Sequence, residues 1–430
     1  MHMLLELTFN NYRLFKGTNT FSFLADKRTK TLMSNSYQLD NRNVLKTMAI
    51  YGPNNSGKSN ICSLFKTIKK VTAGDVSFEM NRALFRDAPL TCVKITFNNE
   101  DDMGWFSYEF HYDSSSSRFV YEKMASIHYY ESNNVQSKTI FEKDYEKKTL
   151  YILNEDKSAF LSFVSSKYPF LFAVEMDSPM FKELTKYKKA LEDFSSSLVV
   201  VNMFNIPIEK TIESLKGSDE NKKQFISSFV KNADISIQGF RYNEVPLLLK
   251  NNDAEISEKT LRDSKDMDMF HLFTKYGDIE VPSVLFDSTG TKKVEAVAAY
   301  IYDAIKGKKT LIMDEMDNGL HYLITKSIVS TFNNLLNDGA QLLFTAHDLM
   351  LIGCKMLLRK DQICFIRRNM VEASVYCLKD ATVSEGGPRS GGDLLKRYNA
   401  GDFEKLPSPD FMDDLIRIKN ERKNHEAKQI

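Results

Sequence analysis

The sequence contains few of the features that mark a secreted, membrane-spanning or zinc-binding protein. Its five cysteines among 430 residues are an odd number, are widely spaced and include no C-x-x-C pair, a pattern that argues against a disulfide framework and against a zinc site. No stretch approaches the roughly 20 apolar residues of a membrane span. The N-terminal segment reaches Glu6, Asn10 and Asn11 before any apolar run long enough for a signal peptide. We therefore expect a cytoplasmic protein without a membrane partner.

The sequence also lacks an excess of charge of one sign. It carries 58 Lys and Arg against 57 Asp and Glu, a formal net charge of +1, so nucleic acid could be bound only by a local patch or an oligomer groove. With 42% hydrophobic and 27% charged residues, it has the composition of a packed globular chain. The length fits about three units of roughly 150 residues, or one α/β domain with an inserted lobe.

Hydrophobic patterning predicts an α/β domain at the N-terminal end. Residues 3–9 and 20–24 alternate apolar and polar side chains as half-buried strands do, and residues 44–52 form an apolar run that ends at a glycine. After residue 60, apolar side chains follow at the spacing of an amphipathic helix: Ile61, Leu64, Phe65 and Ile68. The local order is strand, glycine loop, helix.

The rest of the chain predicts several further segments. Aromatic and β-branched runs from about 91 to 131, separated by turn residues, predict an antiparallel β-meander, and helical spacing within 155–235 predicts an inserted helical lobe. A polar loop is expected at 251–268, and helix-strand alternation resumes from 295 to 357, with strands at 310–314 and 341–346. The charged tail at 416–430 is expected to fray. We divide the chain into an N-terminal lobe (1–150), a helical insert with its linking loop (151–270), a C-terminal lobe (271–400) and a tail (401–430).

A phosphate-binding loop is the most specific motif. The segment GPNNSGKS fits G-x-x-x-x-G-K-[ST] and lies between the predicted strand and helix. Its glycines let backbone N–H groups face the phosphates, while Lys58 reaches the β- and γ-phosphates and the Ser59 hydroxyl ligates Mg²⁺. A fortuitous glycine turn is disfavoured by the flanking strand and helix. The expected ATP-binding residues are Gly52, Pro53, Asn54, Asn55, Ser56, Gly57, Lys58, Ser59 and Asn60.

Two later strands deliver polar side chains at their ends. Asp314 and Glu315 follow an apolar strand, as a magnesium ligand and a general base for the attacking water would. His347 follows the next strand, where it could hydrogen-bond the γ-phosphate or the water. Alone, an acidic pair is more often a solvated turn, and His347 could simply lie beside a helix cap formed by Thr345 or Asp348. The phosphate loop upstream favours the catalytic interpretation.

The segment DSTGTKK at 287–293 precedes a helix and allows two interpretations. A turn made by Ser288, Thr289 and Gly290 at a helix start is a ready anion site. An ordinary helix capped by Ser288 or Thr289 has the same residues. Local chemistry leaves both open.

The motif order resembles that of a known ATPase class. GPNNSGKS, DSTGTKK, LIMDEMDNGLH and LLFTAHD occur in the order found in ABC-type ATPases, a class that includes the SMC, RecF and OLD-like proteins. The segments LTFNNYRLFKG, KNADISI, HLFTKYG and RYNAGDFEKLP resemble the AAA-15 ATPases of bacterial antiphage and abortive-infection modules. The resemblance covers nearly the whole chain and is thinnest across the helical insert. It implies an α/β ABC-type ATPase head with an antiparallel β subdomain and an inserted helical lobe.

The resemblance also implies roles for individual residues. In a head-to-head dimer the turn at Ser288–Gly290 would act in trans on the partner's nucleotide, Asp317 would help to couple the two sites, and His347 would be the switch histidine. Arg13 matches a nucleotide-proximal arginine, although a surface arginine is nearly as compatible. Two features depart from the wider class: the signature reads STG where transporters have SGG, and no glutamine occurs between Gln38 and Gln136 to form a Q-loop.

Three functions agree with these motifs. The first is an ATPase, using ATP and Mg²⁺, that acts as sensor or regulator in an antiphage module, assembles as a homodimer or higher oligomer and controls a separate effector such as a nuclease encoded nearby. The second is a RecF- or SMC-like clamp that grips DNA, and the third is a scaffold that binds ATP with little turnover. A Toprim nuclease is not expected, because the residues after His347 lack the required glutamate and Asp-x-Asp pattern.

Overall fold

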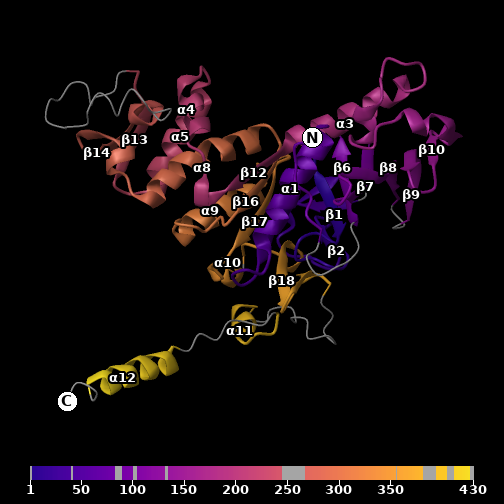
Figure 1. The fold of residues 1–430 in the computed structure, drawn as a ribbon. Coiled ribbons are helices and arrows are strands. Elements are labelled where there is room, and N and C mark those ends of the chain that lie inside the picture. The colour runs from indigo at the N-terminus through magenta and orange to yellow at the C-terminus, as the bar shows by residue number, and fades with distance from the viewer. Residues whose placement is uncertain are drawn as a thin grey trace.

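The computed structural model describes most of the chain. The described residues are 2–39, 42–82, 90–99, 104–130, 134–244, 267–354, 356–380, 394–403 and 411–426. The predicted polar loop at 251–268 therefore lies almost entirely outside them. Two large sheets dominate the structure, and helices cover the second of them (Figure 1).

The first sheet is antiparallel and has eight strands in the order β11-β10-β9-β8-β7-β6-β1-β2. Its strands are β1 (Leu4–Asn10), β2 (Asn19–Ser22), β6 (Leu90–Asn99), β7 (Gly104–Asp113), β8 (Arg118–Tyr129), β9 (Val135–Asp144), β10 (Thr149–Ile152) and β11 (Glu155–Asp156). The predicted meander is confirmed, and it continues beyond residue 131 through three further strands.

The second sheet has six strands in the order β12-β16-β17-β5-β18-β19. All neighbours are parallel except β18 and β19, which form an antiparallel pair. The strands are β5 (Thr47–Tyr51), β12 (Leu198–Asn202), β16 (Thr310–Asp314), β17 (Gln341–Ala346), β18 (Ile363–Asn369) and β19 (Glu372–Cys377). The segment 151–270, which we expected to be helical, thus also supplies the edge strand β12.

The helices that pack against the sheets each bury an apolar side. They are α1 (Lys58–Thr72), α3 (Thr185–Ser197), α4 (Glu209–Lys216), α5 (Glu220–Ala233), α8 (Thr289–Lys306) and α9 (Tyr322–Asn333). Shorter or peripheral helices are α2 (Phe170–Ala173), α7 (Ser283–Phe286), α10 (Met350–Gly353), α11 (Leu394–Asn399) and α12 (Met412–Glu426). The tail that we expected to fray therefore contains α12, and each described helix is too short or too polar to cross a membrane.

Alternation along the parallel strands explains why both faces of the second sheet are buried. Ile50 and Ile312 join the core that contains α1 and the antiparallel sheet. Their neighbours Ala49 and Leu311 join a second core with side chains of α8 and α9. Since successive side chains of a strand point to opposite faces, an uninterrupted apolar run is what a sheet covered on both sides requires. The predicted α/β class is confirmed.

The antiparallel sheet shares its core with α1 and α3. Phe97 of β6 stacks on Phe194 of α3 with ring centroids 4.4 Å apart, a contact worth about 0.5–1.5 kcal/mol beyond its buried area. A third, smaller core joins α4, α5 and α8 to a three-stranded sheet. That sheet consists of β13 (Ile237–Tyr242), β14 (Leu272–Tyr276) and β15 (Ile279–Pro282), and a two-stranded sheet consists of β3 (Ser36–Leu39) and β4 (Arg42–Leu45).

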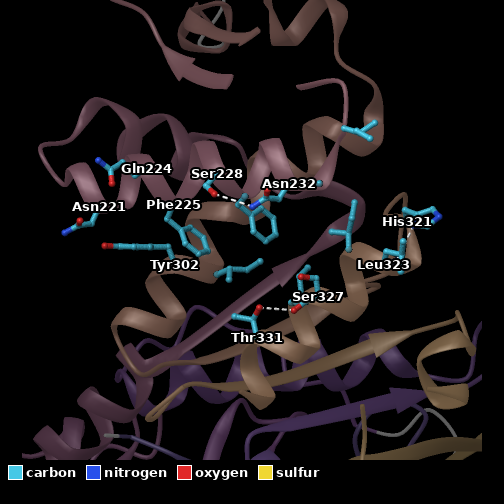
Figure 2. A pocket seen from close by; sticks show the side chains of 16 residues that line it. Asn221, Gln224, Phe225, Ser228, Asn232, Tyr302, His321, Leu323, Ser327 and Thr331 are labelled. Atoms are coloured by element: carbon cyan, nitrogen blue, oxygen red, sulfur yellow. Dashed lines mark hydrogen bonds between the residues drawn. The ribbon is translucent and has the colours of Figure 1, made fainter. Parts of the chain in front are cut away.

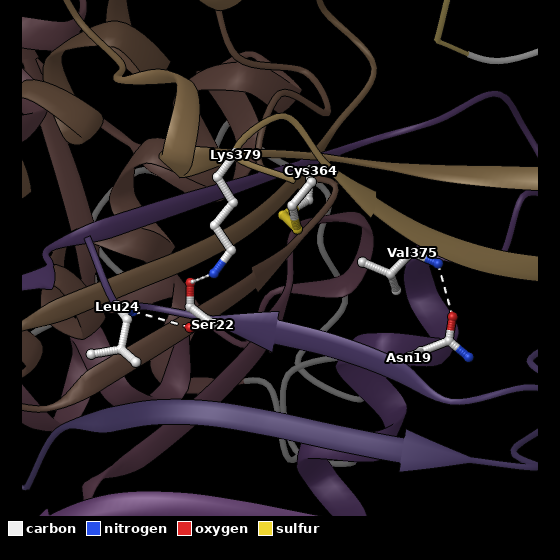
Figure 3. The surroundings of a disulfide bond; sticks show 7 residues. Asn19, Ser22, Leu24, Cys364, Val375 and Lys379 are labelled. Carbon is white, nitrogen blue, oxygen red and sulfur yellow. Dashed lines mark hydrogen bonds between the residues drawn. A yellow bond between two sulfur atoms is a disulfide. The ribbon is translucent and has the colours of Figure 1, made fainter. Parts of the chain in front are cut away.

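One feature of the second sheet contradicts the expectation from cysteine spacing. Cys364 of β18 and Cys377 of β19 form a disulfide, 13 residues apart in sequence (Figure 3). The two residues are direct partners across the antiparallel pair, so strand register brings the thiols together. Cys62, Cys92 and Cys354 are free.

Candidate active site

The phosphate loop connects the buried strand β5 to the first turn of α1. Gly57, the residue before α1, has φ +111°, and a Cβ at this position would lie 3.4 Å from the ring of Phe15. Asn55 also adopts a left-handed backbone, with φ +61°. Both conformations curl the loop over the helix start, where unpaired N–H groups favour an anion.

The side chain of Lys58 lies beneath this loop. It is buried, and its Nζ donates to the carbonyl oxygens of Gly52 at 2.5 Å and Pro53 at 3.0 Å. The same Nζ lies 3.4 Å from Nδ1 of His347. The phosphate loop and the end of β17 therefore meet at one cationic group.

Asp314, at the carboxyl end of β16, is buried and firmly oriented. Its Oδ1 accepts a hydrogen bond from Oγ1 of Thr345 at 2.8 Å, and its Oδ2 accepts one from Nδ2 of Asn202 at 2.9 Å. Both donors are neutral, so these bonds fix the carboxylate without cancelling its charge.

Burial, reinforced by the nearby Asp314 carboxylate, raises the pKa of the Cys62 thiol on α1.

Glu315 has an unusual backbone conformation for a residue other than glycine. Its φ is +53°, a conformation that costs of order 1 kcal/mol and is concentrated at functional sites. Its N–H donates to Oγ1 of Thr345 at 2.8 Å, and its Oε2 accepts from Nδ2 of Asn318 at 3.0 Å. Lys293 of α8 in turn donates to the carbonyl oxygen of Asn318 at 3.1 Å. The candidate base is thus linked to the helix that follows the STG turn.

Asp317 holds the backbone of the segment around His347. Its Oδ2 accepts hydrogen bonds from the N–H groups of His347 at 2.8 Å and Asp348 at 2.5 Å. Partial burial, followed by the charge of Lys58, lowers the pKa of the His347 imidazole, which is therefore neutral at pH 7. Asp348 accepts from the N–H of Met350 at 2.8 Å, but the N-cap residue of α10 is Leu349, without a side-chain cap, so neither Thr345 nor Asp348 is the N-cap expected as an alternative.

The STG turn forms a capped helix start. The Ser288 hydroxyl accepts a hydrogen bond from the N–H of Thr291 at 3.1 Å. The side chains of Ser288 and Thr289 are exposed to solvent. A Cβ on Gly290 would lie 2.7 Å from the carbonyl oxygen of Gly319, so glycine allows this turn to pack against the loop after Glu315. The turn lines a cavity of about 180 Å³ together with Asp234, Gly319 and His321. The phosphate loop of the same chain is not among the residues that line this cavity.

Two arginines contact the nucleotide-binding segment. Arg13 donates from Nη1 to Oδ1 of Asn60 at 3.2 Å, one turn into α1, and its own φ is +50°. Arg368 on β18 donates from Nη1 to the carbonyl oxygen of Asn55. The sequence singled out Arg13 but not Arg368, because only the pairing of β18 with β5 brings residue 368 to the loop.

The oxygen groups at the site fit magnesium. Ser59 is exposed at the first turn of α1 and Asp314 ends β16. Among the described residues, no group of three or more His, Cys, Asp and Glu could hold a metal. Mg²⁺ is commonly bound by one or two protein oxygens with water and substrate phosphates completing its octahedron. A hydroxyl and a carboxylate are therefore a suitable donor set.

A large cavity lies away from these residues. A groove of about 880 Å³ runs between α5, α8 and α9 (Figure 2). Phe225, Ile301 and Ile328 contribute apolar lining, and Asn221 and Gln224 contribute polar lining. It contains no residue of the phosphate loop or of the acidic pair, so its size does not mark it as the nucleotide site.

A family model and several solved structures match most of the chain. A family model described as "AAA domain, putative AbiEii toxin, Type IV TA system" matches residues 48–353. The SMC head domain from Thermotoga maritima is 12% identical, with 87% of this chain and 98% of that chain covered and a TM-score of 0.42. The Smc head domain from Pyrococcus furiosus, bound to the C-terminal domain of ScpA, is 12% identical over 93% of this chain and 100% of that one, with a TM-score of 0.42. No curated protein matches.

Proposed function

The chain belongs to the AAA domain family described as putative AbiEii toxin, Type IV TA system, and we propose on this basis that it binds ATP with Mg²⁺ and hydrolyses it to ADP and phosphate. One observation supports this above all. The Lys58 ammonium lies under the phosphate loop and 3.4 Å from His347. The Thr345 hydroxyl on the neighbouring strand hydrogen-bonds both the Asp314 carboxylate and the Glu315 N–H. Cation, carboxylates and imidazole thus converge at the carboxyl ends of β5, β16 and β17, where α/β sheets bind ligands.

In this proposal each group of the site has a distinct task. Backbone N–H groups of the loop and the Lys58 ammonium bind the phosphates, with Arg13 next to the first turn of α1. Ser59 and Asp314 would hold Mg²⁺, which when bound neutralises developing charge on the phosphates. The Glu315 carboxylate accepts a proton from the attacking water, and the neutral His347 imidazole hydrogen-bonds the water or the γ-phosphate. Hydrogen bonds from Thr345 and Asn318 set the position of these acids before substrate arrives.

The STG turn suits a role in trans. Ser288 and Thr289 are exposed, and the neighbouring Gly290 packs against Gly319. A second copy placed head to head would bring this turn to the nucleotide. We propose a homodimer or higher oligomer in which Ser288, Thr289 and Gly290 complete the nucleotide site of the partner. In this assembly Asp317, which binds the backbone of the His347 segment, couples that segment to closure of the dimer.

The biological role that we propose is regulation of a bacterial antiphage module from the cytoplasm. The family description, which names a toxin and a toxin–antitoxin system, supports a place in such a module. The chain would sense infection or restrain a separate effector, such as a nuclease encoded nearby, through its ATP cycle. The alternative is a RecF- or SMC-like clamp that closes on DNA when ATP binds.

Two substitutions on one helix test the ATPase proposal. Lys58→Ala removes the buried cation, and Lys66→Ala removes an exposed cation of α1. We expect Lys58→Ala to abolish phosphate release and antiphage protection with an unchanged melting temperature, and Lys66→Ala to retain both. Protection that survives loss of turnover would separate defence from ATP hydrolysis.

A binding assay separates the two biological roles. We expect no tight association of the ATP-loaded protein with duplex DNA at low salt. ATP-dependent binding that weakens steeply as salt rises would favour the clamp, because phosphate contacts release counterions.

A further inference from the structure

A cysteine, a histidine and a glutamate lie together on the antiparallel sheet, away from the proposed ATP site. Cys92 of β6 and His111 of β7 are direct cross-strand partners. Glu109 lies two residues before His111 and so on the same face of β7, and its Oε1 is 3.0 Å from Nε2 of His111. Cys92, His111 and Glu109 are all partly exposed. The thiol is therefore within reach of both the imidazole and small molecules in solvent.

Neighbouring strands hold the imidazole in place. The ring of Tyr121 on β8 lies 4.7 Å from the His111 ring, centroid to centroid, at an interplanar angle of 35°. The Tyr121 hydroxyl donates to Oε1 of Glu142 on β9 at 3.1 Å. The charged and titratable groups that face the histidine from these strands are Cys92, Lys94, Glu109, Tyr121, Lys123 and Glu142.

The histidine carries a positive charge at neutral pH. Partial burial lowers the pKa of His111, but its hydrogen bonds to Cys92 and Glu109 outweigh burial and raise the pKa to about 9. This charge lies directly across the strand pair from Cys92, and the thiolate is the nucleophilic form of cysteine. Glu109 keeps the imidazole oriented, as the third group does in other nucleophile–base pairs.

We propose that Cys92 is a reactive thiol and a modification site for small electrophiles and low-molecular-weight disulfides, activated by His111 and positioned by Glu109. With glutathione disulfide, the Cys92 thiolate attacks one sulfur and forms a mixed disulfide. The other glutathione leaves as a thiolate and can take the proton held by His111. One disulfide is exchanged for another, so no additional oxidant is needed.

The other cysteines provide an internal comparison. Cys62 is buried on α1, where burial raises the pKa of its thiol, and Cys364 and Cys377 are paired with each other. Cys354 is partly exposed like Cys92. The alkylation rate of Cys354 therefore serves as the reference for a partly exposed thiol.

Timed alkylation of the folded, full-length protein tests the proposal. Iodoacetamide is applied at pH 7, and modification of the Cys92 and Cys354 peptides is followed by mass spectrometry. We expect Cys92 to react about fivefold faster than Cys354 or more, because the Cys92 thiol lies directly opposite the charged His111. We expect His111→Gln to lower the Cys92 rate about fivefold, and Lys94→Gln, which removes a nearby exposed charge, to change it less than twofold.

A second reagent and a second variant keep the test decisive. Glutathione disulfide should give a mixed disulfide at Cys92 in the wild type and form it more slowly in His111→Gln. If His111→Gln melts early, Glu109→Gln retains both the thiol and the imidazole and should still slow both reactions. Equal rates at Cys92 and Cys354, or rates at Cys92 that neither folded variant changes, would refute the proposal. The readout does not involve ATP, so its outcome is independent of the ATPase proposal.

Discussion

The hydroxyl of Thr345 donates a hydrogen bond to the buried carboxylate of Asp314 at 2.8 Å. The same hydroxyl accepts the N–H of Glu315 at 2.8 Å. One side chain on β17 therefore sets the position of two consecutive acidic residues at the end of β16. Thr345 and Asp314 are 31 residues apart in sequence, and the parallel pairing of β16 with β17 brings them together.

Replacing Thr345 by valine should disrupt this arrangement. Thr345→Val keeps the shape but leaves the Glu315 N–H without this acceptor, which should cost about 1–3 kcal/mol in the free energy of unfolding. Displacement of the acids should lower ATP turnover about 10- to 100-fold. Thr345→Ser, which keeps the hydroxyl, is the matched control. Chemical denaturation and phosphate release measure the two effects, and wild-type turnover in Thr345→Val would show that the hydroxyl does not position the acids.

Glu315→Gln should separate binding from hydrolysis. The amide cannot accept the water proton, so turnover should fall about 100-fold or more, while a fluorescent ATP analogue should bind as tightly as to the wild type. Glu280→Gln on β15 is a control at a carboxylate that instead pairs with Arg241. Turnover that survives Glu315→Gln would remove Glu315 from the role of base.

The pH dependence should report the state of His347. Burial and Lys58 lower its pKa below the usual value of 6.5, against smaller opposing contributions from Asp317, Glu315 and Asp314. The unfolded chain therefore binds more protons at this residue than the folded chain, and its contribution to stability decreases as the pH falls through about 6.5.

Activity should follow the same titration. If the neutral imidazole is required, the acidic limb of the turnover profile should have its midpoint below pH 6.5. His347→Gln, which is neutral throughout, should lower turnover and abolish this limb. If the acidic limb of the turnover profile remains in His347→Gln, that limb belongs to another titrating group.

Gly290→Ala should disturb the packing of the STG turn. The added Cβ would lie 2.7 Å from the carbonyl oxygen of Gly319, so the backbone must shift, at a cost of about 1–3 kcal/mol. We expect a lower melting temperature and a weaker ATP-dependent dimer, measured by thermal unfolding and mass photometry. Gly239→Ala is the control, because its Cβ would meet only Lys275 Cβ at an ordinary 3.7 Å. A full-strength dimer in Gly290→Ala would argue against a role of this turn in assembly.

The sequence by itself determined the phosphate loop and the main α/β elements. The loop is encoded in eight consecutive residues between an apolar run and an amphipathic helix, so its identity depends only on local order. The strands at 310–314 and 341–346 were likewise readable, because each is a continuous apolar run ending at a polar residue. Strand β12 was missed because its short apolar run lies among helical segments and joins the sheet only through β16.

Only the tertiary structure decided which side chains meet. Asn202 and Thr345 reach Asp314 because three parallel strands end at one edge of the sheet, although 112 residues separate Asn202 from Asp314. Strand register, which local sequence does not specify, pairs Cys364 with Cys377 and places Cys92 opposite His111. A shift of one residue would move these side chains to the other face. Motifs name the groups available for chemistry, and long-range strand pairing decides which of them come into contact.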